Sequence, residues 1–275
     1  MNNHHVKQFI KQGLMRLAPE VAGVWQSARE RRHIRRFEQR MGLTELKRSY
    51  LTQHELTVAS GPFAGMKYLS ESVCSALVPK LVGSYEAELH EIIAQALEAG
   101  YTTVVDVGCA EGYYANGFAL RLPSVPVYAF DIDVQARRLC SAMANLNDLQ
   151  DQVTVAGRCD PERLNVVLTG HSLVICDCEG YEENLLRPDL APALAQADVL
   201  VELHDHIRPG ISATLQSRFR DTHDITLVTA IDRDPACYPG LLFSDPADRR
   251  LAVSEFRPAH QQWAFFRAKT GNAAA

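Results

Sequence analysis

The stretch VVDVGCAEGYYANG, residues 104–117, combines a carboxylate with two glycines at the end of an apolar run. Asp106 lies in the run, and Gly108 and Gly112 follow it where a helix should begin. Glycines let a turn adopt unusual dihedrals and let a ligand approach the backbone. A second apolar run ends in Asp131, 23 residues after Gly108, where a carboxylate can accept hydrogen bonds from a ribose diol. Together these residues predict a site for a nucleoside cofactor.

The composition of the loop indicates which cofactor this could be. A dinucleotide fingerprint requires G-x-G-x-x-G, in which the middle glycine makes room for a pyrophosphate. Here the middle position is Ala110, and Glu111 is expected to repel a phosphate. Asp106 suits an ammonium group better than a phosphate. The loop therefore favours S-adenosylmethionine, which has a ribose, an ammonium and a sulfonium, over NAD; a glycine turn without any ligand is the remaining alternative.

Carboxylates and imidazoles also gather at the ends of two later apolar runs. The segment SLVICDCEGYEENLL, residues 172–186, ends its run at Asp177 and continues through Glu179 into a helix. The segment ADVLVELHDHIRPG, residues 197–210, ends its run at His204. Because the carboxyl ends of parallel strands meet at one edge of a sheet, we expect these side chains to lie beside the glycine loop.

Proton transfer is one reaction that this group of side chains could perform. His204 is the first candidate for a general base, since an unperturbed imidazole titrates near pH ~6.5. Asp177 could be the base or could orient an acceptor, and His206 is a weaker candidate. The alternative for His204 is a hydrogen-bonded structural residue, and the alternative for Glu179 is a carboxylate stabilised by a helix N-terminus.

A divalent metal site at the same place is an open alternative. Asp177, Glu202, His204 and Asp205 offer oxygen and nitrogen ligands for Mg²⁺ or a transition ion. Spacing along the chain does not determine which of these atoms could share one ion, so the metal ligands stay undetermined at this stage.

With these motifs in place, the sequence resembles class I S-adenosylmethionine-dependent methyltransferases and, within them, the FkbM-like family. The resemblance lies in DVGCAEGYYA for the cofactor loop, FDID for the ribose acid, ICDCEGYE for the D-x-E-G-x-E segment, and VELH on the following strand. It covers roughly residues 100–206. It implies methyl transfer, often to a hydroxyl oxygen, and a seven-stranded sheet with an antiparallel final hairpin formed by residues 224–230 and 262–269.

The resemblance also implies roles for individual residues. The methionine moiety would contact Asp106 and the loop from Gly108 through Cys109 to Gly112, and Asp131 would hold the ribose. Asp177 would lie near the transferable methyl. Residues Ile132, Arg158 and Cys159 would border the adenine.

Tyrosines and acids next to the loop are further candidates for the site. Tyr113 or Tyr114 could flank the methionine moiety while the other packs in the core. Tyr85 and Glu86, in YEAELHE, could close over the cofactor or acceptor, although such residues more often form a solvated helical face.

Hydrophobic periodicity predicts an α/β fold: a doubly wound, mostly parallel, seven-stranded Rossmann-like sheet with an N-terminal helical extension. We expect a helical extension or cap over residues 1–83, a cofactor-binding domain over 84–270 and a tail over 271–275. The expected strands are 102–107, 126–131, 152–156, 172–177, 198–203, 224–230 and 262–269. The expected helices cover most of 1–55, then 84–100, 112–121, 134–146, 161–168, 181–195 and 211–221.

Composition indicates a reduced, cytoplasmic protein as the default. No stretch of 18 apolar residues is present among the 275, and the N-terminus has no uninterrupted apolar core of a secretion signal. The seven cysteines show no disulfide or C-x-x-C spacing. Cys176 and Cys178 flank Asp177, but buried strand cysteines usually behave as small hydrophobic residues.

Charge is distributed unevenly, which bears on possible partners. Residues 1–50 contain 11 Lys/Arg and 4 Asp/Glu, whereas the whole chain has a net charge of −5. The basic segment 28–40 could contact nucleic acid or an anionic membrane, or could cover the acidic body of the chain or of a second copy in a homodimer. We favour the second reading and a small-molecule acceptor, because an acidic body makes nucleic acid unlikely as the substrate. Arg257 is expected to pair with surface acids. A subunit that binds the cofactor without turnover is the remaining rival.

Overall fold

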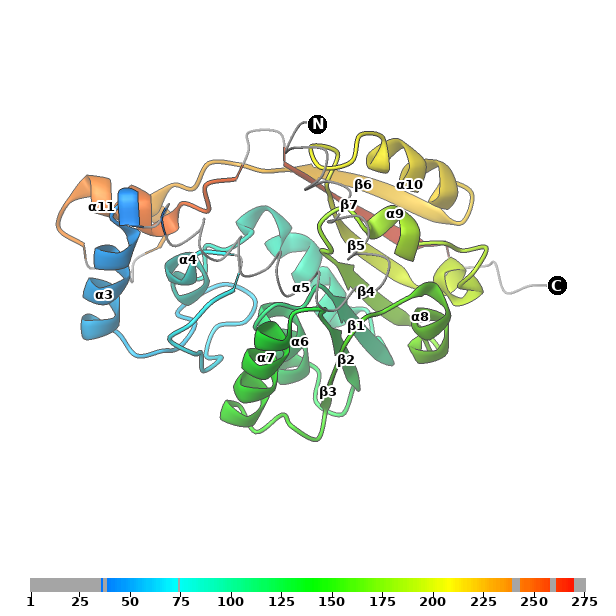
Figure 1. The fold of residues 1–275 in the computed structure, drawn as a ribbon, viewed down its shortest axis with the longest axis horizontal. Helices are drawn as coiled ribbons and strands as arrows, with labels where there is room; N and C mark the ends of the chain where they lie inside the picture. Colours follow the sequence, from blue (N-terminus) through cyan, green and yellow to red (C-terminus); the bar gives the residue numbers. More distant parts are fainter. Residues whose placement is uncertain (1–35, 37–38, 74, 239–242, 258–260, 270–275) are drawn as a thin grey trace, which may run out of the picture.

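The computed structural model describes residues 36, 39–73, 75–238, 243–257 and 261–269, and its core is one seven-stranded sheet. The strand order is β3-β2-β1-β4-β5-β7-β6 (Figure 1). Neighbouring strands among β1 to β5 pair in parallel, whereas β7 is antiparallel to both β5 and β6. This confirms the predicted fold class, including the antiparallel end of the sheet. The strands are β1 Thr103–Val107, β2 Val127–Phe130, β3 Val153–Ala156, β4 Ser172–Cys176, β5 Asp198–Leu203, β6 His223–Thr229 and β7 Gln262–Ala268.

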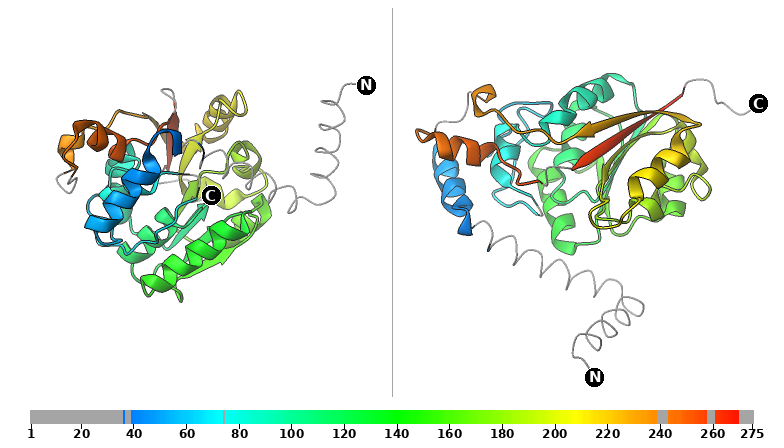
Figure 2. Two further views of the ribbon diagram at one scale, coloured as in Figure 1. Left: turned by 60° about the vertical axis from the view of Figure 1, so that its left-hand side comes forward. Right: turned by 90° about the horizontal axis from the view of Figure 1, so that it is seen from above.

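Helices cover both faces of the sheet, which explains why its central strands β1, β4 and β5 are buried along their whole length. Alternate residues of one strand enter different cores: Val104 packs with α5, α6 and α7, and Val105 packs with α8, α9 and α10. Figure 2 shows α5 and α10 on opposite sides of β6 and β7. The helices are α5 His90–Glu98, α6 Tyr113–Arg121, α7 Val134–Leu146, α8 Pro161–Val167, α9 Glu182–Leu185 and α10 Ile211–Phe219.

Two predicted helices are wrong in part. The segment 84–100 is helical only from Ala87, as the 3₁₀ turn η1 Ala87–Leu89 followed by α5, because Glu86 adopts a left-handed conformation with φ of 47°. Its amide donates to Glu255 and its carboxylate pairs with Arg257, so distant contacts override the local helical pattern. The segment 181–195 is interrupted after α9 and resumes as the 3₁₀ helix η2 Pro192–Gln196, because proline cannot continue a helix.

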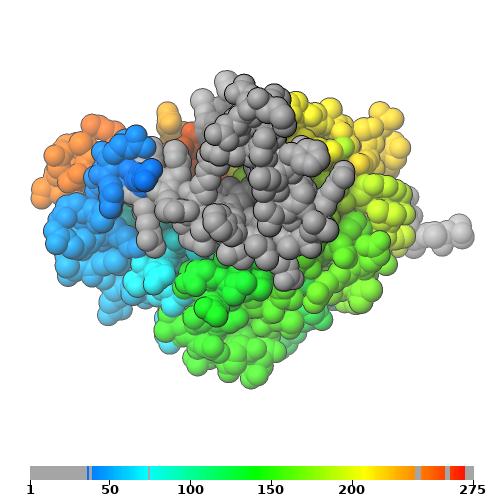
Figure 3. Space-filling view, viewed as in Figure 1, coloured from blue at the N-terminus to red at the C-terminus, as the bar shows by residue number. Residues whose placement is uncertain are grey.

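The part of the chain before the sheet shares its hydrophobic core. Helix α3, Leu43–Gln53, contributes Leu46 and Tyr50 to the cluster that also holds α6. Residues 56–68 form a small hairpin-like turn with a Thr57–Lys67 bridge, and α4, Leu77–Val82, follows it. Helix α11, Pro246–Val253, lies beside α3 (Figure 3). Neither α4 nor α11 was expected, and the apolar core is continuous across residue 83.

The basic segment 28–40 and the apolar positions Leu14, Leu17, Val21, Val24 and Trp25 lie almost wholly outside the described residues. The expected dimer contact through the N-terminal helices therefore stays a prediction. None of the described helices is long and apolar enough to span a bilayer.

At Gly108 the loop after β1 packs directly against the backbone at the end of β4. A Cβ atom built there would lie 1.6 Å from the carbonyl oxygen of Asp177, and its φ is 87°. No side chain fits in that space, so the loop after β1 and the end of β4 approach each other only because residue 108 is glycine.

We therefore predict that Gly108→Ala lowers the free energy of unfolding by about 2 kcal/mol or more, because backbone must move and the left-handed φ is strained. Gly157→Ala is the matched control: no atom lies within 4 Å of its Cβ and its φ is not positive, so its effect should stay within about 0.5 kcal/mol. Urea denaturation of both variants measures the difference, and equal midpoints would contradict the predicted clash.

Candidate active site

The glycine loop is held against the end of β2 by backbone hydrogen bonds. The amide of Gly108 donates to the carbonyl of Phe130 at 2.8 Å. The amide of Ala110, a residue with φ of 48°, donates to Oδ2 of Asp131 at 3.0 Å. The other oxygen of Asp131 accepts the amide of Asp133 at 2.7 Å. Asp131 thus joins the loop to β2, and each of its oxygens keeps lone pairs for further hydrogen bonds.

Asp106 lies at the bottom of the loop, almost fully buried. Its Oδ2 accepts the amide of Ala115 at 3.0 Å, at the start of α6. Burial is the main reason why the pKa of Asp106 is raised to about 8; the amide of Ala115 lowers this pKa, and the neighbouring Asp177 and Asp131 raise it. A positively charged group placed next to this carboxyl would favour its ionised form.

Glu111 does not face the place where a ligand would approach, so the expectation that it repels phosphate is wrong. Its carboxylate is fully buried and pairs with Lys80. It also accepts hydrogen bonds from Tyr68, Ser72 and the amide of Val73. Burial disfavours its charge, but Lys80 and the hydrogen bonds from Ser72 and Val73 together outweigh this and lower the pKa of Glu111. What still speaks against a dinucleotide is the missing middle glycine.

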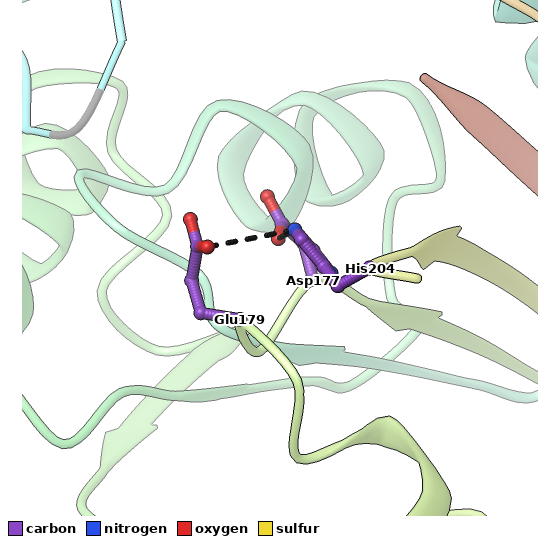
Figure 4. A group of neighbouring side chains, drawn as sticks. All are labelled: Asp177, Glu179 and His204. Carbon is purple, nitrogen blue, oxygen red and sulfur yellow. Dashed lines mark ion pairs between the residues drawn. The ribbon is translucent and has the colours of Figure 1, made fainter. Parts of the chain in front are cut away.

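Three of the predicted catalytic side chains meet at the ends of β4 and β5 (Figure 4). Nε2 of His204 lies 3.6 Å from Oδ1 of Asp177 and 3.6 Å from Oε2 of Glu179. Oε1 of Glu202 lies 3.8 Å from the same nitrogen. These separations are too long for hydrogen bonds, so the ring nitrogen faces three carboxylates without bonding to them. One ligand atom from each of Asp177, Glu179 and His204 lies within 4.8 Å of the others.

The other ring nitrogen of His204 is bound by Glu182, the last residue of the ICDCEGYE segment, to which the sequence analysis assigned no role. Nδ1 lies 2.7 Å from Oε1 of Glu182, and both side chains are buried. Burial lowers the pKa of His204, but Glu182, Asp177 and Glu202 outweigh it and raise that pKa to about 9. At neutral pH the imidazole is therefore mostly protonated, unlike the unperturbed histidine expected from the sequence.

Two neighbouring candidates have other roles. The carboxylate of Asp205 accepts the amides of Gly210 and Ser212, and so caps helix α10 instead of joining the cluster. His206 is exposed, and its ring centroid lies 5.5 Å from that of His204. Of the candidate site residues, the structure thus brings Glu179 together with Asp177 and His204, and it places Asp205 at the start of α10.

Arg257 closes the site from the C-terminal part of the chain, and its partners are buried acids rather than the expected surface acids. Its guanidinium donates to Glu202 at 2.7 Å and to Glu255 at 2.9 Å, and also pairs with Glu86. It lies over the ring of Tyr85 at 5.6 Å. Burial is the main reason why the pKa of Glu86 is raised to about 7. Arg257 lowers this pKa, and the neighbouring Glu255 raises it.

The other residues predicted to contact the cofactor are partly exposed and partly buried. Ile132 is 63% exposed next to Asp131, which leaves an apolar surface at the loop. Arg158 donates to the hydroxyl of Tyr181 at 3.0 Å. Three of the predicted side chains are buried in the apolar cores: Cys109, Tyr113 and Cys159. Only their backbone could contact a ligand without rearrangement. The ring of Tyr85 is also buried and packs against that of Tyr113.

Left-handed backbone at non-glycine residues is concentrated around this site. Glu86, Ala110, Glu179 and Phe256 have φ between 47° and 55°. Such conformations cost about 1–3 kcal/mol each and persist where surrounding contacts impose them. Four segments far apart in sequence are thus held in unusual conformations at one edge of the sheet.

No protein-family model matches the sequence, and no curated protein matches it. Many solved structures share the general fold at low similarity. Cofactor-bound Rv0187 from MTB is 14% identical, with a TM-score of 0.47 over 65% of this chain and 78% of that one. An O-methyltransferase from Bacillus cereus in complex with SAH is 10% identical, with a TM-score of 0.46 over 67% and 81% of the two chains. The O-methyltransferase TomG from Streptomyces achromogenes is also 10% identical, with a TM-score of 0.44 over 67% and 80%. At these values the likenesses carry no argument about function.

We predict that Lys80→Met lowers the free energy of unfolding by about 3–5 kcal/mol, because it leaves the carboxylate of Glu111 buried without a cation. The double variant Lys80→Met/Glu111→Gln should recover most of this loss, since an amide can keep the hydrogen bonds from Tyr68 and Ser72. Chemical denaturation of the single and double variants measures the coupling. A double variant as unstable as Lys80→Met would contradict the assignment of the loss to an unpaired charge.

Proposed function

We propose that this chain is an S-adenosylmethionine-dependent methyltransferase, similar to FkbM-like enzymes, that methylates a hydroxyl oxygen of a small molecule. The main support is that a glycine loop with Asp106 and Asp131 lies at the same sheet edge as the cluster around His204. Ligands of doubly wound sheets bind at this edge, where the strand order reverses between β1 and β4.

Each part of the site has a role in this proposal. When bound, the cofactor supplies a methyl group on a sulfonium whose departure needs no proton. Asp106 would bind the ammonium, and its buried carboxyl would ionise when that charge arrives. Asp131 would accept the ribose hydroxyls, and Ile132 would lie against the adenine.

His204 would take the proton of the acceptor hydroxyl through Nε2, while Asp177 and Glu179 orient the acceptor. Because its pKa is about 9, His204 must first lose its Nε2 proton at neutral pH. A positive charge brought among the surrounding carboxylates would lower that pKa and favour the neutral ring.

Isothermal titration calorimetry with S-adenosylhomocysteine tests the cofactor. We predict that the wild-type chain binds it and that Asp131→Asn weakens binding about 10- to 100-fold, because hydrogen bonds to a charged group are lost. Asp221→Asn is the control, since that side chain is 88% exposed and belongs to no part of the site. Absence of heat with the folded wild type, or an equal affinity in the Asp131 variant, would contradict the proposal.

Transfer of a radiolabelled methyl group to a small-molecule extract separates a methyltransferase from a subunit that only binds the cofactor. Labelled product that His204→Gln reduces while affinity for the cofactor product is retained would support the base role. Cofactor binding without any labelled product would favour the non-catalytic subunit.

Divalent-metal assistance is a second candidate, favoured by the donor set at the strand ends. Oδ1 of Asp177 is buried and has no hydrogen-bond partner among the described residues. Nε2 of His204 and Oε2 of Glu179 complete a set of nitrogen and oxygen donors that suits Mg²⁺, Mn²⁺ or Zn²⁺. Such an ion would act as a Lewis acid on the acceptor oxygen. The residues present therefore fit a small divalent cation.

Titration with Mn²⁺, followed by calorimetry and electron paramagnetic resonance, tests this candidate. We predict binding to the wild type that Asp177→Asn weakens about tenfold or more and that Asp205→Asn leaves unchanged, because Asp205 caps α10. A wild type that binds no Mn²⁺ at millimolar concentration, or an equal loss in the Asp205 variant, would exclude this ligand set.

A further inference from the structure

We infer that Glu182 is the positioning residue of this site: one of its carboxylate oxygens holds both His204 and the loop that carries Asp177 and Glu179. The inference rests on the proposed function, because it concerns how the nitrogen assigned to proton transfer is oriented. Glu182 is the first residue of α9 and its side chain is fully buried.

A single oxygen of Glu182 makes three polar contacts. Oε1 lies 2.7 Å from Nδ1 of His204. The same oxygen accepts the backbone amides of Cys178 at 3.2 Å and Gly180 at 3.1 Å. The end of β4 and the end of β5 are therefore connected through one atom.

The first contact determines which nitrogen of His204 faces the site. A carboxylate oxygen only accepts hydrogen bonds, so Nδ1 must carry a proton to bond with it. When the ring is neutral, its lone pair is then on Nε2, which faces Asp177 and Glu179. Without Glu182 either nitrogen could carry the proton and the ring could rotate.

The two amide contacts hold the loop in an otherwise unfavourable conformation. Glu179 and Gly180 are both left-handed, with φ of 53° and 93°. The loop also lies against the segment after β5, since a Cβ at Gly180 would be 3.1 Å from Cγ2 of Ile207. The bonds to Glu182 thus hold the backbone of the loop that carries Glu179 beside the end of β5.

The two oxygens of Glu182 have different surroundings. Its second oxygen, Oε2, is buried and has no hydrogen-bond partner among the described residues. Leaving a buried oxygen unpaired costs free energy, and the contacts of the other oxygen, led by His204, still lower the pKa of Glu182 and keep it ionised.

The experiment combines nuclear magnetic resonance of ¹⁵N-histidine-labelled full-length chain with kinetics. The variants are Glu182→Ala and Glu182→Gln, and Glu183→Gln is the matched control because its carboxylate pairs with Arg208 at 2.8 Å, outside the cluster. The spectrum of His204→Gln assigns the signals. In the wild type and the control we expect Nδ1 of His204 to stay protonated while Nε2 exchanges its proton.

Glu182→Ala should lose this preference for Nδ1 and reduce kcat about 100-fold at unchanged KM and cofactor affinity. Glu182→Gln should keep the Nδ1 proton and lose less than about tenfold, because an amide oxygen can accept the same three hydrogen bonds.

Several outcomes would overturn the inference: a wild-type His204 with its fixed proton on Nε2, an unchanged ring in Glu182→Ala, or a loss in Glu182→Gln as large as in Glu182→Ala. If Glu182→Ala does not fold, the wild-type and Glu182→Gln spectra decide the question. If the wild type shows the expected ring but binds no cofactor product, the proposed function fails and the positioning role stands.

Discussion

The close approach of Gly108 to the backbone of Asp177 is the constraint on which the site depends. Any side chain at residue 108 would overlap a carbonyl oxygen, so the loop after β1 and the end of β4 can meet only at a glycine. This contact brings the loop with Asp106 and Ala110 next to the cluster around His204. A molecule lying on the loop would therefore end beside the group of side chains that can move a proton.

The buried charged groups near this contact are of two kinds, paired and incompletely paired. Lys80 and Glu111 form a closed, buried pair that connects the segment before the sheet with the glycine loop. At the strand ends, by contrast, acids outnumber cations: burial raises the pKa of Asp106 to about 8, that of Glu86 to about 7 and that of Glu202 well above its usual range. Arg257 and protonated His204 are the cations next to these carboxyls, and a further positive charge would favour their ionised forms. The open part of the site is thus suited to receiving a cation.

Strain is concentrated at the same edge. Four non-glycine residues near this edge are left-handed. Glu86 precedes α5 and Ala110 lies in the glycine loop. Glu179 follows β4, and Phe256 is next to Arg257. Three of them are held by contacts from other segments: the amide of Glu86 bonds to Glu255, that of Ala110 bonds to Asp131, and the loop with Glu179 bonds to Glu182. The sheet beneath them is packed between two apolar cores, which support these conformations.

The sequence by itself determined the sheet, the order of its strands along the chain and the glycine loop. These depend on local patterns: apolar runs of strand length, helical periodicity between them, and glycines at the turn. Only the tertiary structure decided that Glu111 turns inward to Lys80, that Glu182 rather than Asp205 joins His204, and that helix 84–100 begins late so that Glu86 reaches Arg257. Glu86 and Arg257 are 171 positions apart. Charged pairs between such distant residues leave no periodic signal in a sequence, because their energy arises only when burial and neighbouring charges are fixed by the fold.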